Sequence, residues 1–501
     1  MIAASSVARA GTGEGSTSAS GGTSSSGKVP TFTLDQAILT ALQQNPTLLN
    51  AEQEIKRTKG VIIQVRAQAL PQITPTGEYQ WTDPNLGTSG GGIAGGASVA
   101  QNLRSDIFYD IRVLGTQLVF NGTTYPQIRG TFFQRDSSDF AFRNTLDQLL
   151  ATVKTQFYQV VVNRELIKVQ EQSVHLLESQ LKDQQNRFEA GTVPRFNVLQ
   201  AEVALYNQLP QLITAQNNYR ISKITLAKTL GLDFQPGRGE NPPLEVVGEM
   251  PYNPRTISLV NAIEMGKQRR PFLKQARANV LNQLQQVRAA AGQYLPTITT
   301  SGGGEWVSSP TNSSWHDISK GWVAGVQGSM PVWDSGAIAG QVVQQRALLS
   351  EAKITYDDDV RQVELEVQTA YSNLQQNREL IVSQEKNVEQ AEEALRLAKA
   401  RLDAGAGVQL DVLNAQVQLL TAQSTRLQAL FGYNSQLAEF DRATGAQSSY
   451  QEMFADLAPS ATKTKTYYTG SGVDAEGKRK KADDDNTVRP SSGRSRTSHS
   501  K

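Results

Sequence analysis

The chain has 501 residues, which predicts roughly three domains at about 150 residues each. With 38% apolar residues and a mean hydropathy of −0.40, it contains no run near the ~18 uncharged apolar residues of a membrane-spanning helix. Its net charge is +2, and it has no basic patch that would predict nucleic-acid binding. The absence of cysteine excludes disulfides and thiolate metal sites, and three widely separated histidines (His175, His316 and His499) do not favour a metal site, so no metal or cofactor is expected.

The two ends of the chain are predicted to lie outside the folded part. Residues 1–30 are rich in serine, glycine, alanine and threonine without apolar periodicity, which is typical of disorder. Ala8-Arg9-Ala10 matches a signal-peptidase pattern, but no apolar core precedes it, so the presence of a signal peptide stays open. Residues 448–501 are predicted to be a mostly disordered extension, because its basic and acidic runs lie side by side as in a solvated tail.

The first predicted unit covers residues 31–248 and has the order helix, helix, strand, strand, very long helix, helix. Its first strand begins at Pro71, where a helix must stop. The long helix spans about 100 Å at 1.5 Å per residue and ends at a turn that contains Gly191. The strands are expected at about 71–83 and 106–120, the long helix at about 125–189 and the last helix at about 196–231.

The second predicted unit, residues 249–447, repeats the first. The segment NRELI at Asn163–Ile167 recurs at Asn377–Ile381, an offset of 377 − 163 = 214 residues. Upstream the offset is 225, so the first copy carries about eleven extra residues, which we assign to a glycine-rich loop at Gly87–Gly96. The stretch Pro236–Pro254 joins the two copies. The second set of strands is expected at about 296–307 and 318–333, the long helix at about 339–403 and the last helix at about 410–445.

Both long helices carry an apolar series with 3-4-3-4 spacing over six heptads, which predicts a coiled-coil seam. Each seam has an asparagine and a glutamine at the same two positions. These polar residues either set the register of the helices in the core, as a buried asparagine often does, or line a channel. The seam positions are Leu146, Leu149, Val153, Gln156, Val160, Asn163, Ile167, Gln170, Val174, Leu177, Leu181, Gln184 and Phe188, and, 214 residues later, Val360, Val363, Val367, Ala370, Leu374, Asn377, Ile381, Gln384, Val388, Ala391, Leu395, Ala398 and Leu402.

The four strands have alternating apolar and polar residues with aromatic residues near their ends, such as Tyr79, Trp81, Trp306 and Trp322. This pattern suits a membrane barrel, and it equally suits a soluble antiparallel sheet. Four strands cannot close a barrel, because the smallest membrane barrels have about eight. If the strands form a barrel, several chains must build it.

The repeat, the position of the strands and the two helix tips resemble the TolC family of outer-membrane channels over residues 31–450. The specific marks are RFEAGTVPRFNVLQA from Arg187 and RLDAGAGVQLDVLNA from Arg401. The resemblance implies a homotrimer in which four strands per chain make a twelve-stranded β-barrel in the lipid of the bacterial outer membrane. It implies that the helical hairpins form a tunnel across the periplasm, whose tips dock a periplasmic adaptor (membrane fusion) protein connected to an inner-membrane pump.

The resemblance also implies roles for particular residues. Asp411 matches the first of the acidic rings of the family's periplasmic gate, whereas Asn414 stands where the second acid would be, and Asn197 occupies the equivalent acid position of the first copy. Gly407 and Leu402 occupy positions where some members have an arginine and a tyrosine that lock the closed state. The residues that resemble the adaptor-docking grooves are Arg187, Gly191, Arg401 and Gly405.

No enzyme signature is found. The glycine-rich runs lack the strand-to-helix setting and the lysine of a phosphate loop. Asp334-Ser335-Gly336 has no matched histidine and is interpreted as a helix cap. The expected function is therefore passive conduction as the exit duct of an efflux or type I secretion system, with no nucleic-acid partner. The alternative is a soluble or periplasmic coiled-coil scaffold without a barrel.

Overall fold

The computed structural model describes residues 31–81, 107–232, 244–255, 258–308 and 318–446. The segments predicted to be disordered, 1–30 and 448–501, and the loop at Gly87–Gly96 lie outside these residues. Among the described helices, none combines the length and the apolar content needed to cross a membrane.

The predicted order of elements is confirmed, and it occurs twice. Each copy begins with a short helix and a medium helix that meet at a proline, Pro46 or Pro271. The bounds of the two units, 31–248 and 249–447, stay a prediction. The first copy contains α1 (Leu34–Gln44), α2 (Pro46–Ala67), β2 (Gln72–Trp81), β3 (Ile107–Phe120), α3 (Thr124–Glu189) and α4 (Arg195–Leu230). The second contains α5 (Leu259–Arg269), α6 (Pro271–Gly292), β5 (Thr297–Ser308), β6 (Ile318–Ser329), α7 (Ala337–Asp403) and α8 (Gln409–Thr444).

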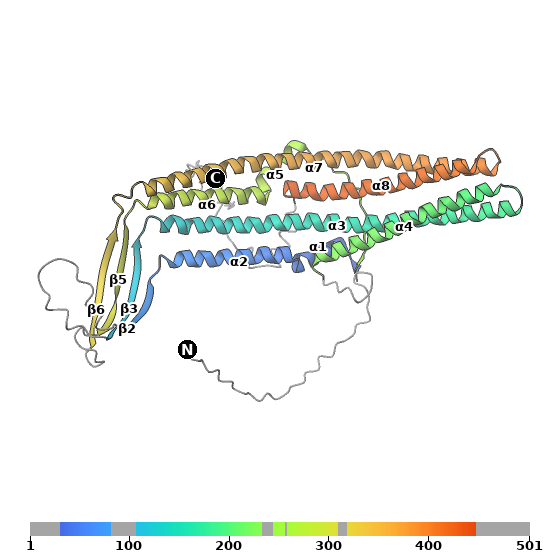
Figure 1. The fold of residues 1–501 in the computed structure, drawn as a ribbon. Coiled ribbons are helices and arrows are strands. Elements are labelled where there is room, and N and C mark those ends of the chain that lie inside the picture. The colour runs from blue at the N-terminus through green and yellow to red at the C-terminus, as the bar shows by residue number, and fades with distance from the viewer. Residues whose placement is uncertain (1–30, 82–106, 233–243, 256–257, 309–317, 447–501) are drawn as a thin grey trace, which may run out of the picture.

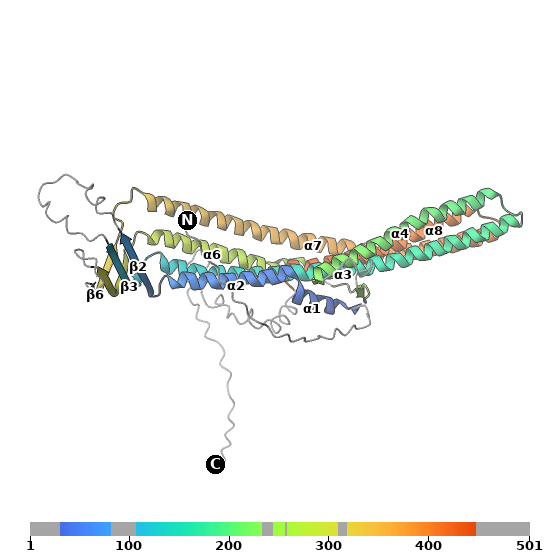
Figure 2. The same ribbon diagram turned by 60° about the horizontal axis from the view of Figure 1, so that its bottom comes forward.

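The helices form one elongated layer with the sheet at one end and the hairpin tips at the other (Figures 1 and 2). In the half next to the sheet, the packing partners give the order α2-α3-α6-α7. In the half next to the tips, α4 replaces α2 and α8 replaces α6, which gives the order α4-α3-α8-α7. The layer therefore has two lateral edges, formed by α2 and α4 on one side and by α7 on the other.

The sheet is antiparallel in the order β2-β3-β5-β6, so its two central strands come from different copies. Its edge strands β2 and β6 continue the two edges of the helical layer (Figure 1). The last strand was expected to reach residue 333, but β6 ends at Ser329. Pro331 explains the difference, because proline has no backbone N–H to donate to a strand ladder.

All positions of the two heptad seams are buried or half-buried, with one exception. In α7 the seam positions include Val363, Val367 and Ile381, each fully buried. In α3 they include Val153 and Val160. Phe188, the last seam position of α3, is 44% exposed, because the helix ends one residue later and no partner covers it.

The sequence did not predict a small parallel sheet formed by β1 (Thr31–Phe32) and β4 (Glu245–Val246). Leu244 and Val246 are buried in the largest apolar cluster of the molecule. The guanidinium of Arg164 on α3 donates to the carbonyls of Val246 and Gly248, both at 2.8 Å. This end of the stretch that joins the two copies is therefore part of the core and not a free linker.

Candidate functional site

The two hairpin tips have the same backbone geometry. Gly191 and Gly405 lie just past the ends of α3 and α7 with φ of 73° and 71°, the left-handed conformation that favours glycine after a helix. In each tip the residue after the glycine donates its backbone N–H to the carbonyl of Arg187 or Arg401, at 2.9 Å. The four residues predicted to dock an adaptor thus occupy equivalent positions on two matching turns.

Arg187 connects the two tips. Its guanidinium lies 2.8 Å from Asp183 on its own helix and 3.4 Å from Asp403 at the end of α7. Asp403 is 71% exposed at the side chain, and an ion pair this exposed contributes at most about 1 kcal/mol. Arg401 makes no ion pair with any described residue. Sequence reasoning missed the Arg187–Asp403 contact, because its two residues are 216 positions apart.

The three predicted gate residues lie near the starts of α4 and α8. Asp411 is exposed in the first turn of α8, where the helix dipole favours a carboxylate. Asn414 is exposed one turn later, and Asn197 is half-buried in the first turn of α4. Within the described residues, no hydrogen bond joins these three side chains to one another.

Two further positions of the predicted gate have a packing explanation. Leu402 is half-buried against Leu395 and Val412. A Cβ atom on Gly407 would lie 3.1 Å from the backbone of Arg401 and Leu402, tighter than an ordinary contact. This turn therefore favours glycine, and a larger residue at position 407 would require the backbone to move.

Four glutamines form what we call the glutamine seam, a contact between α3 and α8 just above the tips: Gln180, Gln184, Gln409 and Gln416. Gln184 donates to Gln409 at 3.3 Å, and Gln180 donates to Gln416 at 3.1 Å. Gln416 in turn donates to the backbone carbonyl of Ser173 at 3.3 Å. The sequence pattern included Gln184 in a coiled-coil seam but gave no sign of its partner on α8.

The glutamine seam is buried and incompletely hydrogen-bonded. Gln184, Gln409 and Gln416 are 3%, 6% and 5% exposed. The side-chain oxygens of Gln180 and Gln184 and the nitrogen of Gln409 have no hydrogen-bond partner among the described residues. Each buried polar atom without a partner costs about 1–3 kcal/mol. The contact between the two hairpins is therefore weaker here than an apolar contact of the same size.

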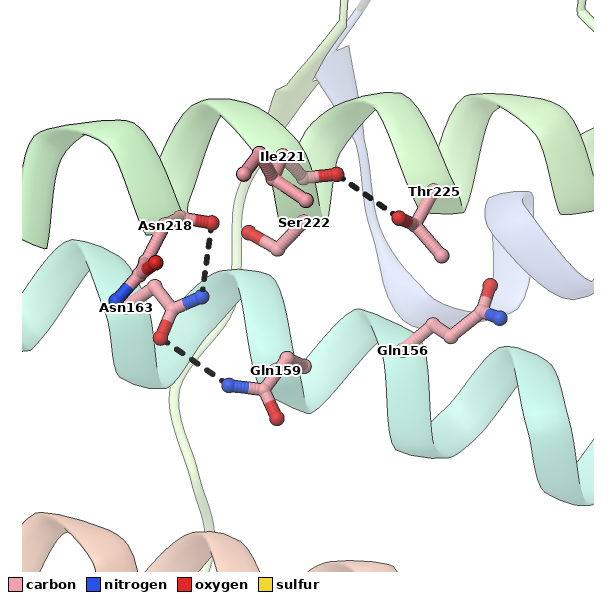
Figure 3. Close-up of a pocket in the computed structure, with 7 residues that line it drawn as sticks. All are labelled: Gln156, Gln159, Asn163, Asn218, Ile221, Ser222 and Thr225. Atoms are coloured by element: carbon pink, nitrogen blue, oxygen red, sulfur yellow. Dashed lines mark hydrogen bonds between the residues drawn. The ribbon is translucent and has the colours of Figure 1, made fainter.

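A polar cavity of about 290 Å³ lies between α3 and α4 (Figure 3). Asn163 is buried beside it, donates to the carbonyl of Asn218 on α4 at 3.2 Å and accepts from Gln159 at 3.1 Å. A buried asparagine that binds the partner helix favours the register-setting alternative for Asn163 over channel lining. The lining residues carry no charge: Gln156, Gln159, Asn163, Asn218, Ile221, Ser222 and Thr225.

The sheet has one polar and one apolar face. On the polar face the guanidinium of Arg112 on β3 lies 2.5 Å from Asp110 and 3.0 Å from Glu305 on β5. Glu78 on β2 pairs with Asp110 across the strands, so this face carries three acids and one base. Large apolar side chains on the opposite face are exposed: Ile73, Tyr79, Trp81, Ile111, Trp306, Trp322 and Val326.

A charged network lies where α5 meets α6. Arg270 is 4% exposed and donates to Glu366 of α7 at 2.5 Å, and Arg442 of α8 donates to the same carboxylate at 2.9 Å. Burial alone would raise the pKa of Glu366, but hydrogen bonds from Gln362 and Arg270 and the charges of the two arginines hold it below its usual value. Among the described residues, no group of three or more acidic, histidine or cysteine side chains is arranged to hold a metal ion.

The chain is similar to known proteins over most of its described length. The family model for outer membrane efflux proteins matches residues 37–232 and 262–446. The chain is 22% identical over 318 residues to nodulation protein T of Rhizobium leguminosarum bv. trifolii. The alignment covers 62% of this chain and 64% of that protein, so the chain spans just under two thirds of this relative's length. It is 23% identical over 405 residues to the outer membrane efflux protein BepC of Brucella suis, which covers 79% of this chain and 82% of that protein.

The fold is also that of solved channels. The CmeC outer membrane channel of Campylobacter jejuni has a TM-score of 0.71 at 16% identity and covers 84% of this chain and 88% of that one. The expected α+β fold with long helical hairpins is confirmed. The prediction that the chain is an outer-membrane channel is also confirmed, and the alternative prediction of a soluble scaffold is wrong. The chain belongs to the outer membrane efflux protein family.

Proposed function

We propose that three copies of this chain close into a homotrimer with a twelve-stranded barrel and a periplasmic helical tunnel. The observation that carries the proposal is that the sheet and the helical layer are open along the same two edges. One edge consists of β2, α2 and α4, and the other of β6 and α7. Two different edges that pair head to tail between copies close into a ring. The number three rests on the resemblance to the TolC family.

The two faces of the sheet support this arrangement. In a closed barrel, residues that alternate along each strand face the lipid or the lumen. The exposed apolar face, with Trp81 and Trp322, suits outer-membrane lipid. The polar face, with Asp110, Arg112 and Glu305, suits a water-filled lumen. Substrate would pass through this lumen without chemical change, and the energy would come from an inner-membrane pump.

The tips are the proposed docking site for a periplasmic adaptor. The exposed Arg401 and the half-buried Arg187 stand beside left-handed turns at Gly191 and Gly405, where their side chains and the turn backbone would meet a partner hairpin. The ion pair between Arg187 and Asp403 is weak enough for a docked partner to replace.

The proposed gate is a ring of three Asp411 carboxylates at the periplasmic mouth of the trimer. Asn414 and Asn197 are neutral, so this ring carries fewer charges than the paired acidic rings that the family resemblance implies. Fixed negative charge in a pore attracts cations. Asp411→Ala should therefore reduce block of the channel by added polyvalent cations, and equal block in both proteins would remove Asp411 from the gate.

The assembly is tested on protein extracted from outer membranes with detergent. We expect a heat-resistant trimer on gels and single-channel currents in planar bilayers. A monodisperse monomer that stays soluble without detergent would overturn the proposal.

The docking site is tested by crosslinking. The chain has no cysteine, so Arg187→Cys or Arg401→Cys introduces a single reactive thiol. Crosslinks to a periplasmic adaptor from either tip are expected, and none from the matched control Arg361→Cys, an exposed arginine in the middle of α7. Equal capture from all three positions would remove the tips as the docking site.

A further inference from the structure

A second cavity, of about 690 Å³, lies where the start of α6 and the end of α8 meet the middle of α3. Its volume falls in the range of about 300–1,000 Å³ that is typical of small-molecule sites. Most of its lining residues belong to α3, α6 and α8, which are inner helices of the layer. Joining copies along the two lateral edges of the layer would therefore leave this cavity uncovered.

Arg270, which lines this cavity, has guanidinium donors that the protein leaves unused. Its side chain is 5% exposed, and its Nη2 donates to Glu366. Its Nε and Nη1 have no hydrogen-bond partner among the described residues. The ring of Phe272, another lining residue, lies 5.5 Å from the guanidinium carbon and helps to hold it in place. Buried donors without an acceptor are unfavourable, so a ligand that supplies an acceptor here would be bound.

The start of α6 lacks an acceptor that the start of α2 has. In the first copy, the side-chain oxygen of Asn45 accepts from the backbone N–H groups of Thr47 and Leu48, at 2.8 and 3.2 Å. In the second copy, the equivalent residue is Arg270, and no side chain caps α6. The N–H groups and the dipole at the start of a helix attract an anion. An anion beside Arg270 would therefore take the place of the Asn45 oxygen.

The charges already present in the cavity favour a ligand with a single negative charge. Arg270 and Arg442 both bond to Glu366, and Arg442 also bonds to Glu439 at 2.5 Å, so two bases face two acids. The backbone N–H groups of Gly445 and of the residue after it bond to carbonyls in the last turn of α8, which offsets the negative end of that helix. The start of α6 then leaves about half a positive charge, which a dianion would exceed.

The wall that α3 contributes is polar and uncharged. It presents amide and hydroxyl side chains, among them Asn144, Gln148, Thr155 and Gln156. The side-chain oxygen of Gln156, which also lines the cavity of Figure 3, has no donor among the described residues. An acceptor without a donor suits a hydroxyl group on the ligand.

We propose that this cavity binds a small monocarboxylate that carries a hydroxyl group, with the carboxylate at the start of α6 beside Arg270. The inference goes beyond the proposed conduit, because the site lies within one chain, away from the barrel strands and the tips. The bound carboxylate supplies to α6 the cap that Asn45 supplies to α2. It thereby stabilises the place where the second hairpin meets the half of the molecule next to the sheet.

The first test measures binding of lactate to the full chain in detergent by ligand-observed NMR. Lactate should bind the wild-type protein and raise its thermal midpoint. Propionate lacks the hydroxyl and sulfate carries two charges, so both should bind more weakly than lactate.

The second test changes Arg270. Arg270→Asn gives α6 the residue that caps α2 and removes the unused guanidinium donors, so lactate should bind at least about tenfold more weakly. Arg270→Lys keeps a positive charge for Glu366 and lacks the guanidinium, and it should also weaken binding if the asparagine variant does not fold. The matched control is Arg277→Asn, an exposed arginine on the same helix, which should bind lactate as the wild type does.

Three results would overturn the inference: no binding of lactate to the wild-type protein, unchanged binding in a folded Arg270 variant, or sulfate binding as tight as that of lactate. Failure of the chain to form a trimer or to conduct would instead overturn the proposed conduit. The two failures are distinguishable, because lactate binding is read without any current.

Discussion

The two long helices α3 and α7 arise from equivalent segments of the repeat, yet they have different surroundings. They have 66 and 67 residues, and each is followed by the same glycine turn. α3 lies in the middle of the layer and packs against α2, α4, α6 and α8, whereas α7 lies at its edge and packs against α5, α6 and α8. Large apolar residues of α7 are correspondingly exposed: Val343, Leu348, Ile354, Leu365, Leu380, Val382 and Leu397.

This difference shows that a heptad seam specifies one face of a helix and leaves the others undetermined. The seams of both helices are buried or half-buried apart from Phe188, and the seam of α3 also meets α8 of the other copy through Gln184. The remaining faces of α3 are covered by the other copy of the repeat, which α7 lacks on its outer side. The exposed apolar face of α7 is therefore the surface that a neighbouring copy would cover in the proposed trimer.

The largest expected effect on the free energy of unfolding concerns the charged network of Arg270 and Glu366, where α5 meets α6. Arg270 is equivalent to Asn45 of the first copy, but Asn45 caps α2 through Thr47 and Leu48, whereas Arg270 pairs with Glu366 of α7. Arg270→Ala should lower the free energy of unfolding by about 3 kcal/mol, because it breaks a buried ion pair.

The matched variant Asn45→Ala removes a helix cap and should cost about 1 kcal/mol. Denaturant unfolding of the detergent-solubilised protein measures both. Equal losses would show that the two junctions are held by interactions of the same strength.

The second prediction concerns the start of α3, which is more crowded than the start of α7. A Cβ atom on Gly122 would overlap the carbonyl oxygen of Gly292, so Gly122→Ala should cost about 2 kcal/mol. In α7, Gly340 has open space around it, and Gly340→Ala should raise stability slightly, because alanine favours a helix. The two thermal midpoints should therefore move in opposite directions, and a parallel shift would contradict this account.

The third prediction tests whether a neighbouring copy covers α7. Leu365 is 57% exposed, so Leu365→Asp should change the stability of the isolated chain by less than about 0.5 kcal/mol. It should nevertheless abolish the heat-resistant trimer, because a buried unpaired charge opposes association. Val417→Asp on the inner helix α8, where the side chain is 61% exposed, is the control and should leave the trimer intact.

The smallest expected effect is a pH dependence at the start of α7. The Asp334 carboxylate accepts the backbone N–H of Ile338 at 2.6 Å and of Gly336 at 3.1 Å, and these bonds hold its pKa below the ordinary 3.8. A depressed pKa means that this cap contributes stability above pH 3.8 and loses it as the pH falls through the folded value.

At the equivalent position of α3, the amide of Asn121 accepts from Thr123 at 2.7 Å and does not titrate. Hydrogen exchange should show acid-induced fraying in the first turn of α7 and none in that of α3. Asp334→Asn should remove the difference between the two helices. Fraying of both helices in acid would assign the effect to another group.

The hairpin tips show which features of the candidate site could be predicted from the sequence. The glycine turns and the positions of Arg187 and Arg401 follow from a local pattern, because a left-handed residue after a helix favours glycine. The side chains that contact the tip residues cannot be predicted from this local pattern. Asp403 and Gln409 lie more than 200 positions from Arg187 and Gln184, and the packing of the hairpins alone brings them together.

The repeat, the order of elements, the coiled-coil seams and the strands follow from the amino-acid pattern, because neighbouring residues share each periodicity or turn signal. Only the packing of the two copies makes α3 central and α7 an edge helix, joins strands of both copies through Arg112, and brings glutamines together between the hairpins. These features depend on how two similar units pack against each other. Two copies with nearly the same local pattern cannot specify locally which of them is covered.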